Sequence, residues 1–183
     1  GWRLALDVER VDAWTQVTSL QHVKVGEAFI TVTANLAYDI DNAGVKALRV
    51  RLPATAEGVR FRSELVSDFK PVPPQPNEPL VEWEIKLSRR ALGKLLLQVN
   101  YTLPLAERAA EAVLTGIEAR EVNLQRGFVS LASEGRLQVK IDAVPATLQP
   151  AEWQAIPRLL QQEAPVAGAT HTFRLVEPAF TLP

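Results

Sequence analysis

Val81-Glu82-Trp83-Glu84-Ile85-Lys86-Leu87 alternates apolar and charged side chains without interruption. Successive side chains of a β-strand point to opposite faces, so this period of two predicts a strand with one buried face and one wet face. Residues 29–40 repeat the pattern, with Ile30 to Ile40 apolar at every second position. Residues 135–142 and 2–8 repeat it as well, and the segments 45–52, 58–66, 93–103 and 170–176 follow it less cleanly. Two further strands are expected at 113–119 and 121–131.

Turn-forming residues lie between these segments. Residues 39–44 and 133–135 contain Asp, Asn, Ser and Gly, which are typical of turns. The stretch 70–79 holds five prolines. Proline removes a backbone donor and fixes φ, so this stretch is not a central strand. We expect a stiff surface loop between two strands, with a proline-rich docking peptide as the alternative interpretation.

About eleven short strands with short connections predict an all-β fold, a two-layer antiparallel β-sandwich, because two stacked sheets can hide a continuous apolar face. A closed barrel is the alternative. One or two short helices are expected near residues 150–162, with Pro150 at the first helical position and a break at Pro157. We expect this helical segment to lie across an open end of the sheets and to place Trp153 on the core.

The length and the composition favour one domain, residues 1–183. The 20 basic and 21 acidic side chains are evenly distributed, so no basic surface for nucleic acid or an anionic membrane is expected. No apolar run is long enough to cross a bilayer, so we expect no direct membrane insertion. The chain begins at Gly1 and contains no Met, which favours a domain excised from a longer chain.

Residues with catalytic or metal-binding chemistry are few. The absence of Cys excludes disulfides, thiolate nucleophiles and Cys-based metal sites. Of the two histidines, His22 is expected on a solvent face and His171 nearer the core edge. No His spacing typical of a metal site occurs, no serine lies in a Gly-x-Ser-x-Gly turn, and no base is visibly paired with a serine. We therefore expect no catalytic residue, no metal and no cofactor.

Two pairs of carboxylates could in principle serve as acid and base of a glycosidase. Glu82 and Glu84 share one strand face, and Asp7 and Glu9 share another. Arginines at outward positions of neighbouring strands could instead form cross-strand ion pairs with them, namely Arg49, Arg51, Arg60 and Arg62. We favour the ion-paired, solvated face over the active site.

Aromatic residues offer one alternative function. Trp2, Trp83 and Trp153 share positions with apolar residues and are expected in the core, whereas Trp14 has polar neighbours. If Trp14, Tyr38 and Tyr101 lined one surface, they could form a carbohydrate-binding site, so a glycan is a possible ligand.

Four motifs follow one another from about residue 45 onwards. They are Arg51-Leu52-Pro53, Val81 to Leu87, Leu97-Gln98-Val99-Asn100-Tyr101-Thr102-Leu103-Pro104-Leu105, and Arg126-Gly127-Phe128-Val129-Ser130-Leu131. This order resembles β-sandwich modules of large, poorly characterised bacterial envelope proteins. The resemblance implies a scaffold or interaction module in the periplasm or at the cell surface, without catalytic residues.

Together these observations predict a non-catalytic structural or protein-interaction module of a larger bacterial extracytoplasmic protein, not an enzyme. Its expected partners are neighbouring domains of the parent chain or another protein, and not nucleic acid. A carbohydrate-binding module is the alternative, and a glycosidase domain using Glu82 or Glu84 is a more distant one.

Overall fold

A computed structural model describes residues 9–74, 76–106, 111–162 and 169–182. The strand predicted for residues 2–8, which contains Trp2, lies outside them, as does Asp7. The strands are β1 (Trp14–Val25), β2 (Phe29–Pro53), β3 (Glu57–Arg62), β4 (Val66–Pro71), β5 (Leu80–Pro104), β6 (Leu114–Thr115), β7 (Glu118–Arg120), β8 (Leu124–Ser133), β9 (Leu148–Pro150), β10 (Ala169–Leu175) and β11 (Thr181–Leu182). The helices are the 3-10 turn η1 (Trp153–Ala155) and α1 (Arg158–Gln161). The predicted all-β class is confirmed.

The main sheet has nine strands in the order β3-β5-β2-β1-β8-β10-β9, with β4 added to β5 and β7 added to β2. Strands β6 and β11 form a separate two-stranded sheet. All pairs are antiparallel except one: β1 and β8 run parallel, with His22 opposite Ser130. The sheet is therefore mixed, and the purely antiparallel sandwich expected from the short connections is wrong in this respect.

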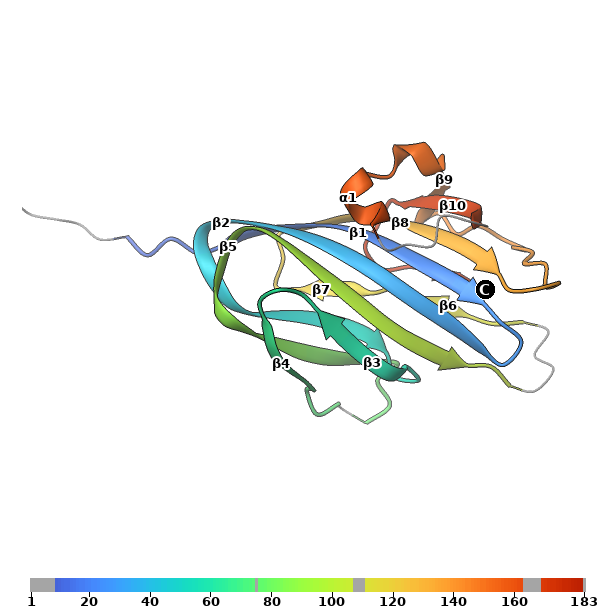
Figure 1. The fold of residues 1–183 in the computed structure, drawn as a ribbon, viewed down its shortest axis with the longest axis horizontal. Coiled ribbons are helices and arrows are strands. Elements are labelled where there is room, and N and C mark those ends of the chain that lie inside the picture. Colours follow the sequence, from blue (N-terminus) through green and yellow to red (C-terminus); the bar gives the residue numbers. More distant parts are fainter. Residues whose placement is uncertain (1–8, 75, 107–110, 163–168, 183) are drawn as a thin grey trace, which may run out of the picture.

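Two long strands build both layers of the fold. The predicted strands 29–40 and 45–52 are one continuous strand, β2, and the predicted strands 80–87 and 93–103 are likewise one strand, β5. Both strands curl back at the same end of the molecule, so their two halves lie in different layers (Figure 1). We call the layer with β1, β3 and β8 layer A, and the layer with β4 and β7 layer B. Residues 39–44, which the sequence predicts as a turn between two strands, lie at this bend.

The bend is a run of register shifts in the β2–β5 pair, between Ile40 and Val45 and again between Val45 and Ala47. Asn42 and Gly93 have positive φ values of 70° and 81° there, whereas Gly44 in the predicted turn does not have a positive φ. Carbonyls that lose their ladder partners accept hydrogen bonds from long side chains. Arg90 Nη1 donates to the Gly44 carbonyl at 2.9 Å, and Lys46 Nζ donates to the Ser88 carbonyl at 3.0 Å.

The core lies between the layers. Every apolar residue predicted to face inward in 29–40 is buried, from Ile30 to Ile40. Ile85 and Leu87 are buried as well, while Trp83 is half-buried in an aromatic cluster with Phe61 and Phe69. Each fully buried large apolar side chain stabilises the fold by about 1.5–3 kcal/mol, so this alternation decides the fold.

Three shorter predictions require correction. Residues 135–142 do not form a strand, although Leu137, Val139 and Ile141 are more buried than the residues between them. Their alternation places them along the surface without a partner strand. The predicted strand 58–66 is two strands, β3 and β4, and the predicted strand 113–119 is divided between β6 and β7. The proline-rich stretch is a loop from Val72 to Pro79, as predicted, with Gln75 outside the described residues.

Strand β1 was not predicted from the sequence. Its polar residues Thr15, Ser19, Gln21 and His22 are buried, because both faces of β1 are covered. The inner face packs into the core, and Leu20 on the outer face contacts the helical segment. A strand covered on both sides does not need one polar face, so alternation is a weak signal for it.

The helical segment is where the sequence predicts it, but not against the surface expected. Pro157 separates η1 from α1 as predicted, whereas Pro150 belongs to β9. Ile156 and Leu160 pack on Leu20 and on partly buried residues of the neighbouring strands, so the segment covers the outer face of layer A rather than an open end (Figure 1). Trp153 packs against this second, smaller cluster.

Two buried glutamines join the layers. Gln21 of β1 and Gln125 of β8 point from layer A towards the backbone that leads into β7 in layer B. Gln125 Oε1 accepts a hydrogen bond from the Ala119 N–H at 2.8 Å, and its Nε2 donates to the Ile117 carbonyl at 3.0 Å. Gln21 Oε1 accepts from the Ile117 N–H at 3.0 Å. The two side chains thus provide hydrogen-bond partners for the backbone of Ile117 and Ala119, which would otherwise be buried without them.

Candidate functional site

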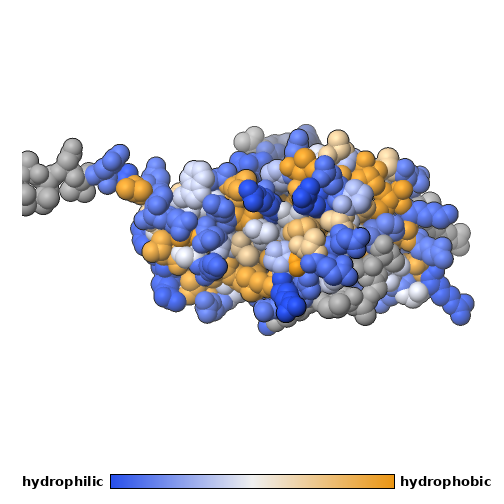
Figure 2. Space-filling view, turned by 90° about the horizontal axis from the view of Figure 1, so that it is seen from above, coloured by the Kyte–Doolittle hydropathy of each residue, from blue (hydrophilic) through white to orange (hydrophobic). Residues whose placement is uncertain are grey.

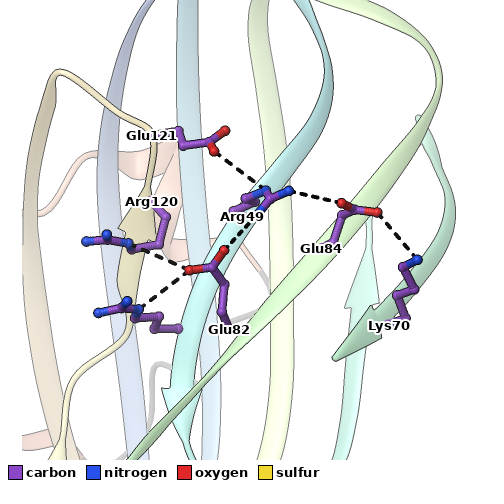
Figure 3. Close-up of polar contacts among 7 residues, drawn as sticks. Arg49, Lys70, Glu82, Glu84, Arg120 and Glu121 are labelled. Carbon is purple, nitrogen blue, oxygen red and sulfur yellow. Dashed lines mark hydrogen bonds and ion pairs between the residues drawn. The ribbon is translucent and has the colours of Figure 1, made fainter. Parts of the chain in front are cut away.

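The outer face of layer B carries a network of ion pairs centred on Arg49 (Figure 3). Cross-strand register places Arg49 opposite Glu84 and Arg51 opposite Glu82. Arg49 Nη1 lies 2.9 Å from Glu82 Oε1, and its Nη2 lies 3.2 Å from Glu84 Oε2. Hydrogen bonding to Glu82 raises the pKa of the Arg49 guanidinium.

Further charges surround this centre. Arg51 and Arg120 both approach Glu82, at 3.6 and 3.9 Å, while Lys70 approaches Glu84 at 3.9 Å. Glu121 lies 3.6 Å from the Arg49 Nε. The interpretation of Glu82 and Glu84 as members of an ion-paired outer face is therefore supported, whereas Arg60 and Arg62 are on β3 in layer A and take no part in the network.

The arrangement of Glu82 and Glu84 differs from the carboxylate pair that the glycosidase alternative requires. A glycosidase needs one carboxyl group that protonates the leaving group and a second that faces the sugar or a water molecule. Here both carboxylates accept hydrogen bonds from the same guanidinium on an outer sheet face.

The structure brings together one serine and one histidine that the sequence did not pair. His22 Nδ1 lies 2.7 Å from Ser130 Oγ, on adjacent parallel strands. Both expectations about these residues are wrong. His22 is only 3% exposed rather than on a solvent face, and Ser130 does have a base beside it. Burial, with a smaller effect of the Lys24 charge, lowers the pKa of the His22 imidazole.

This pair resembles the nucleophile and base of a hydrolase in distance only. Ser130 is 0% exposed, so a substrate cannot reach its hydroxyl in this conformation. A nucleophile also needs donors that stabilise the charge of the attacked group, in an accessible position. We therefore interpret the pair as a buried hydrogen bond that joins β1 to β8.

The aromatic residues proposed for a carbohydrate site do not share a surface. Tyr38 and Tyr101 are each 2% exposed and belong to the core between the layers. Burial raises the pKa of both phenols. Only Trp14 is accessible, at 46%. Both tyrosines occupy inward positions of β2 and β5, so the strand period that buries their neighbours buries them too.

A cavity of about 700 Å³ opens between β3, β4 and the outer face of layer A. Asn35 and Gln98, which are buried amides, lie at its floor, and Gln98 Nε2 is 3.4 Å from Asn35 Oδ1. Asn35 Nδ2 also donates to the carbonyls of Leu160 and Gln162, both at 2.8 Å, which fastens the end of α1 to the sheet. The charges at the cavity, from Arg62, Glu64 and Asp68, are mixed, so it favours no charged ligand.

Within the described ranges, no three His, Asp or Glu side chains are grouped so that they could hold a metal ion. In the same part of the chain, no helix is both long and apolar enough to cross a bilayer. On the side of the molecule that carries α1, apolar residues form separate patches among hydrophilic ones (Figure 2).

Neither the family models nor the curated proteins contain a match to this chain. Solved structures do match it. Yeast leukotriene A4 hydrolase in complex with bestatin aligns over 92% of this chain with a TM-score of 0.50 and 8% identity. The native Saccharomyces cerevisiae enzyme aligns over 94% with a TM-score of 0.47 and 9% identity. A non-cellulosomal cohesin from Archaeoglobus fulgidus aligns over 66% of this chain and 93% of its own, with a TM-score of 0.37 and 16% identity.

The chain spans 28% of the length of the two yeast structures. At 8% identity, the likeness to the bestatin complex concerns the fold alone: the chain folds like a β-rich portion of a much larger protein.

Proposed function

We propose that this domain is a non-catalytic structural or protein-interaction module of a larger bacterial protein. The observation that carries the proposal is the state of its chemically capable side chains. His22 and Ser130 are hydrogen-bonded to each other in a buried position, and Glu82 and Glu84 are bound by Arg49. All four side chains are bound to other side chains of the domain, which supports an interaction role over a catalytic one.

We further propose that the parent protein acts outside the cytoplasm, in the periplasm or at the cell surface. The support is the resemblance of the motifs from Arg51 to Leu131 to modules of bacterial envelope proteins. The partners would be neighbouring domains of the parent chain or a separate protein.

The carbohydrate-binding alternative has lost its main support. It requires Trp14, Tyr38 and Tyr101 on one surface, and only Trp14 is accessible. One exposed ring does not make the platform of several aromatic residues that the alternative requires.

The catalytic part of the proposal is tested with a panel of esterase, glycosidase and phosphatase substrates. We expect no turnover by the purified protein, and equal background rates for Ser130→Ala, Glu82→Gln and Glu84→Gln. Turnover that one of these variants abolishes would overturn the proposal.

The interaction part is tested by lysine cross-linking of the full-length parent protein in its native cells. Lys46, Lys70 and Lys140 are exposed and lie at the bend of β2, in β4 and in the segment after β8, so they report on different parts of the surface. We expect cross-links from at least one of them to another domain or another protein. Cross-links confined to this domain would contradict an interaction role.

A further inference from the structure

A second cavity, of about 650 Å³, lies at the edge of layer A. The start of β8 and the end of β10 form its walls, and Gln149 of β9 contributes the third side. Arg126 and Arg174 both line it. Their strands are neighbours in the antiparallel β8–β10 pair, in which Arg174 lies opposite Phe128, two residues from Arg126.

No acidic side chain lines this cavity to neutralise the positive charge of Arg126 and Arg174. None of its lining residues is acidic, and Glu177, which directly follows the lining residue Val176, is not among them. Among the described residues, neither Arg126 nor Arg174 forms an ion pair, whereas Arg49, Arg51 and Arg120 all do. Two guanidinium groups therefore share one hollow without a carboxylate.

The cavity also orients one of its two cations and offers apolar surface. Gln149 Oε1 accepts a hydrogen bond from Arg174 Nη2 at 2.8 Å, which holds that guanidinium in place. Leu124, Phe128 and Val176 supply apolar contacts. Guanidinium groups bind carboxylates through paired, charge-assisted hydrogen bonds, and the apolar walls suit the aliphatic side chains beside them.

We propose that this cavity binds an acidic segment of a partner protein, in which Asp or Glu carboxylates alternate with aliphatic residues. The inference rests on the proposed function and gives the partner's chemistry: Arg126 and Arg174 hold the carboxylates, and Leu124 and Val176 hold the aliphatic groups. A free phosphate ion shares the anionic chemistry but not the apolar contacts.

The test is an NMR titration of the isotope-labelled protein with a synthetic peptide of alternating Asp and Leu. We expect shifts concentrated in residues 124–128 and 174–176, and weaker binding as salt concentration rises. The double variant Arg126→Ala/Arg174→Ala should bind at least about tenfold more weakly, since charge-assisted contacts are lost. Arg60→Ala/Arg136→Ala, which removes two exposed arginines outside the cavity, should bind like the wild type.

Two further ligands test whether binding needs the carboxylates and the apolar contacts of the peptide. A peptide of alternating Asn and Leu should not bind measurably, and inorganic phosphate should bind more weakly than the acidic peptide. Equal binding of the Asn peptide, or phosphate binding as tightly as the acidic peptide, would overturn the inference. The hydrolase panel is independent of this titration, so loss of the inference leaves the non-catalytic role to be judged separately.

Discussion

At the scale of single residues, the core contains two tyrosine hydroxyl groups that are buried without a hydrogen-bond partner among the described residues. Tyr38 and Tyr101 bury hydroxyl groups that make no hydrogen bond with the described residues. An unpaired buried hydroxyl costs free energy, because it gives up water without gaining a partner. The aromatic rings, by contrast, fill the core and stabilise it.

The substitution Tyr101→Phe tests this account of the core. It keeps the ring and removes the unpaired hydroxyl, so we expect the free energy of unfolding to stay the same or to rise by up to about 1 kcal/mol. Tyr101→Ala, as the control, should lose about 3–5 kcal/mol, because it leaves a cavity. Urea denaturation measures both. A loss of more than about 1 kcal/mol in the Phe variant would show that the hydroxyl has a partner.

The buried imidazole of His22 should make stability depend on pH. Burial lowers its pKa in the folded state from the ordinary value of 6.5. Above pH 6.5 the imidazole is neutral in both states, and its full contribution to stability is present. Below pH 6.5 the unfolded chain binds a proton that the folded chain does not. The free energy of unfolding therefore decreases as the pH is lowered.

His22→Gln isolates this contribution, because the amide can still form a hydrogen bond but does not titrate in this range. We expect the wild type and the variant to differ by a constant amount above pH 6.5, and the wild-type advantage to shrink as the pH falls further. Denaturation between pH 5 and 8 measures the difference. A difference that does not change with pH would rule out a lowered pKa.

At the scale of single elements, alternation predicted strands that have one face towards solvent. It missed β1, which is covered on both faces. Residues 80–87 have a clean period of two because their outer side chains are at least partly exposed, and the same holds for most outer side chains of 29–40, with buried Asn35 as the exception. Strand β1 lies between β2 and β8 beneath the helical segment, so polar and apolar residues are buried together. Residues 135–142 have the alternation but no partner strand, and a sequence pattern does not report pairing.

The candidate sites were less predictable than the strands for a related reason. The pairing of Arg49 with Glu84 needs only a local cross-strand register, and outward charges on neighbouring strands predict it. The contacts of His22 with Ser130, and of Gln125 with Ala119, depend on the parallel β1–β8 pair and on the approach of two layers. The Arg126–Arg174 cavity depends on the β8–β10 register. No local pattern in the sequence specifies these long-range neighbours.

The glutamine that joins β8 to the start of β7 can be tested directly. Gln125→Leu leaves the Ala119 N–H and the Ile117 carbonyl without this partner, so we expect a loss of about 2–4 kcal/mol in the free energy of unfolding. Gln138→Leu, at an exposed position, should change it by less than about 0.5 kcal/mol. Equal effects of the two substitutions would show that the buried hydrogen bonds contribute nothing.

At the scale of the whole molecule, the fold depends on β2 and β5 bending together. Gly93 has a φ of 81°, and no atom lies within 4 Å of the position that a Cβ would occupy, so a substitution there is strained by the backbone alone. Gly93→Ala should cost about 1–2 kcal/mol. Gly93→Asn should cost less, because Asn tolerates the left-handed conformation. Thermal denaturation compares the two, and an Ala variant as stable as the wild type would contradict this description of the bend.

The bend also explains why the domain has one closed interior. Each of the two long strands contributes a half to either layer, so neither layer can separate without breaking a strand that runs through both. Buried apolar residues from both halves form a single cluster, from Ile30 and Val50 to Ile85 and Val99. The interior is thereby sealed, and the charged groups of the network around Arg49 remain outside it.

Native-state hydrogen exchange tests this central claim most directly. Under mildly denaturing conditions, we expect the amides of 30–40 and 95–103 in layer A and those of 47–52 and 81–87 in layer B to exchange with the same free energy of opening, because both layers unfold together. If layer B exchanged with a much smaller free energy than layer A, the core would open to solvent in the native protein, and the claim of one sealed interior would be wrong.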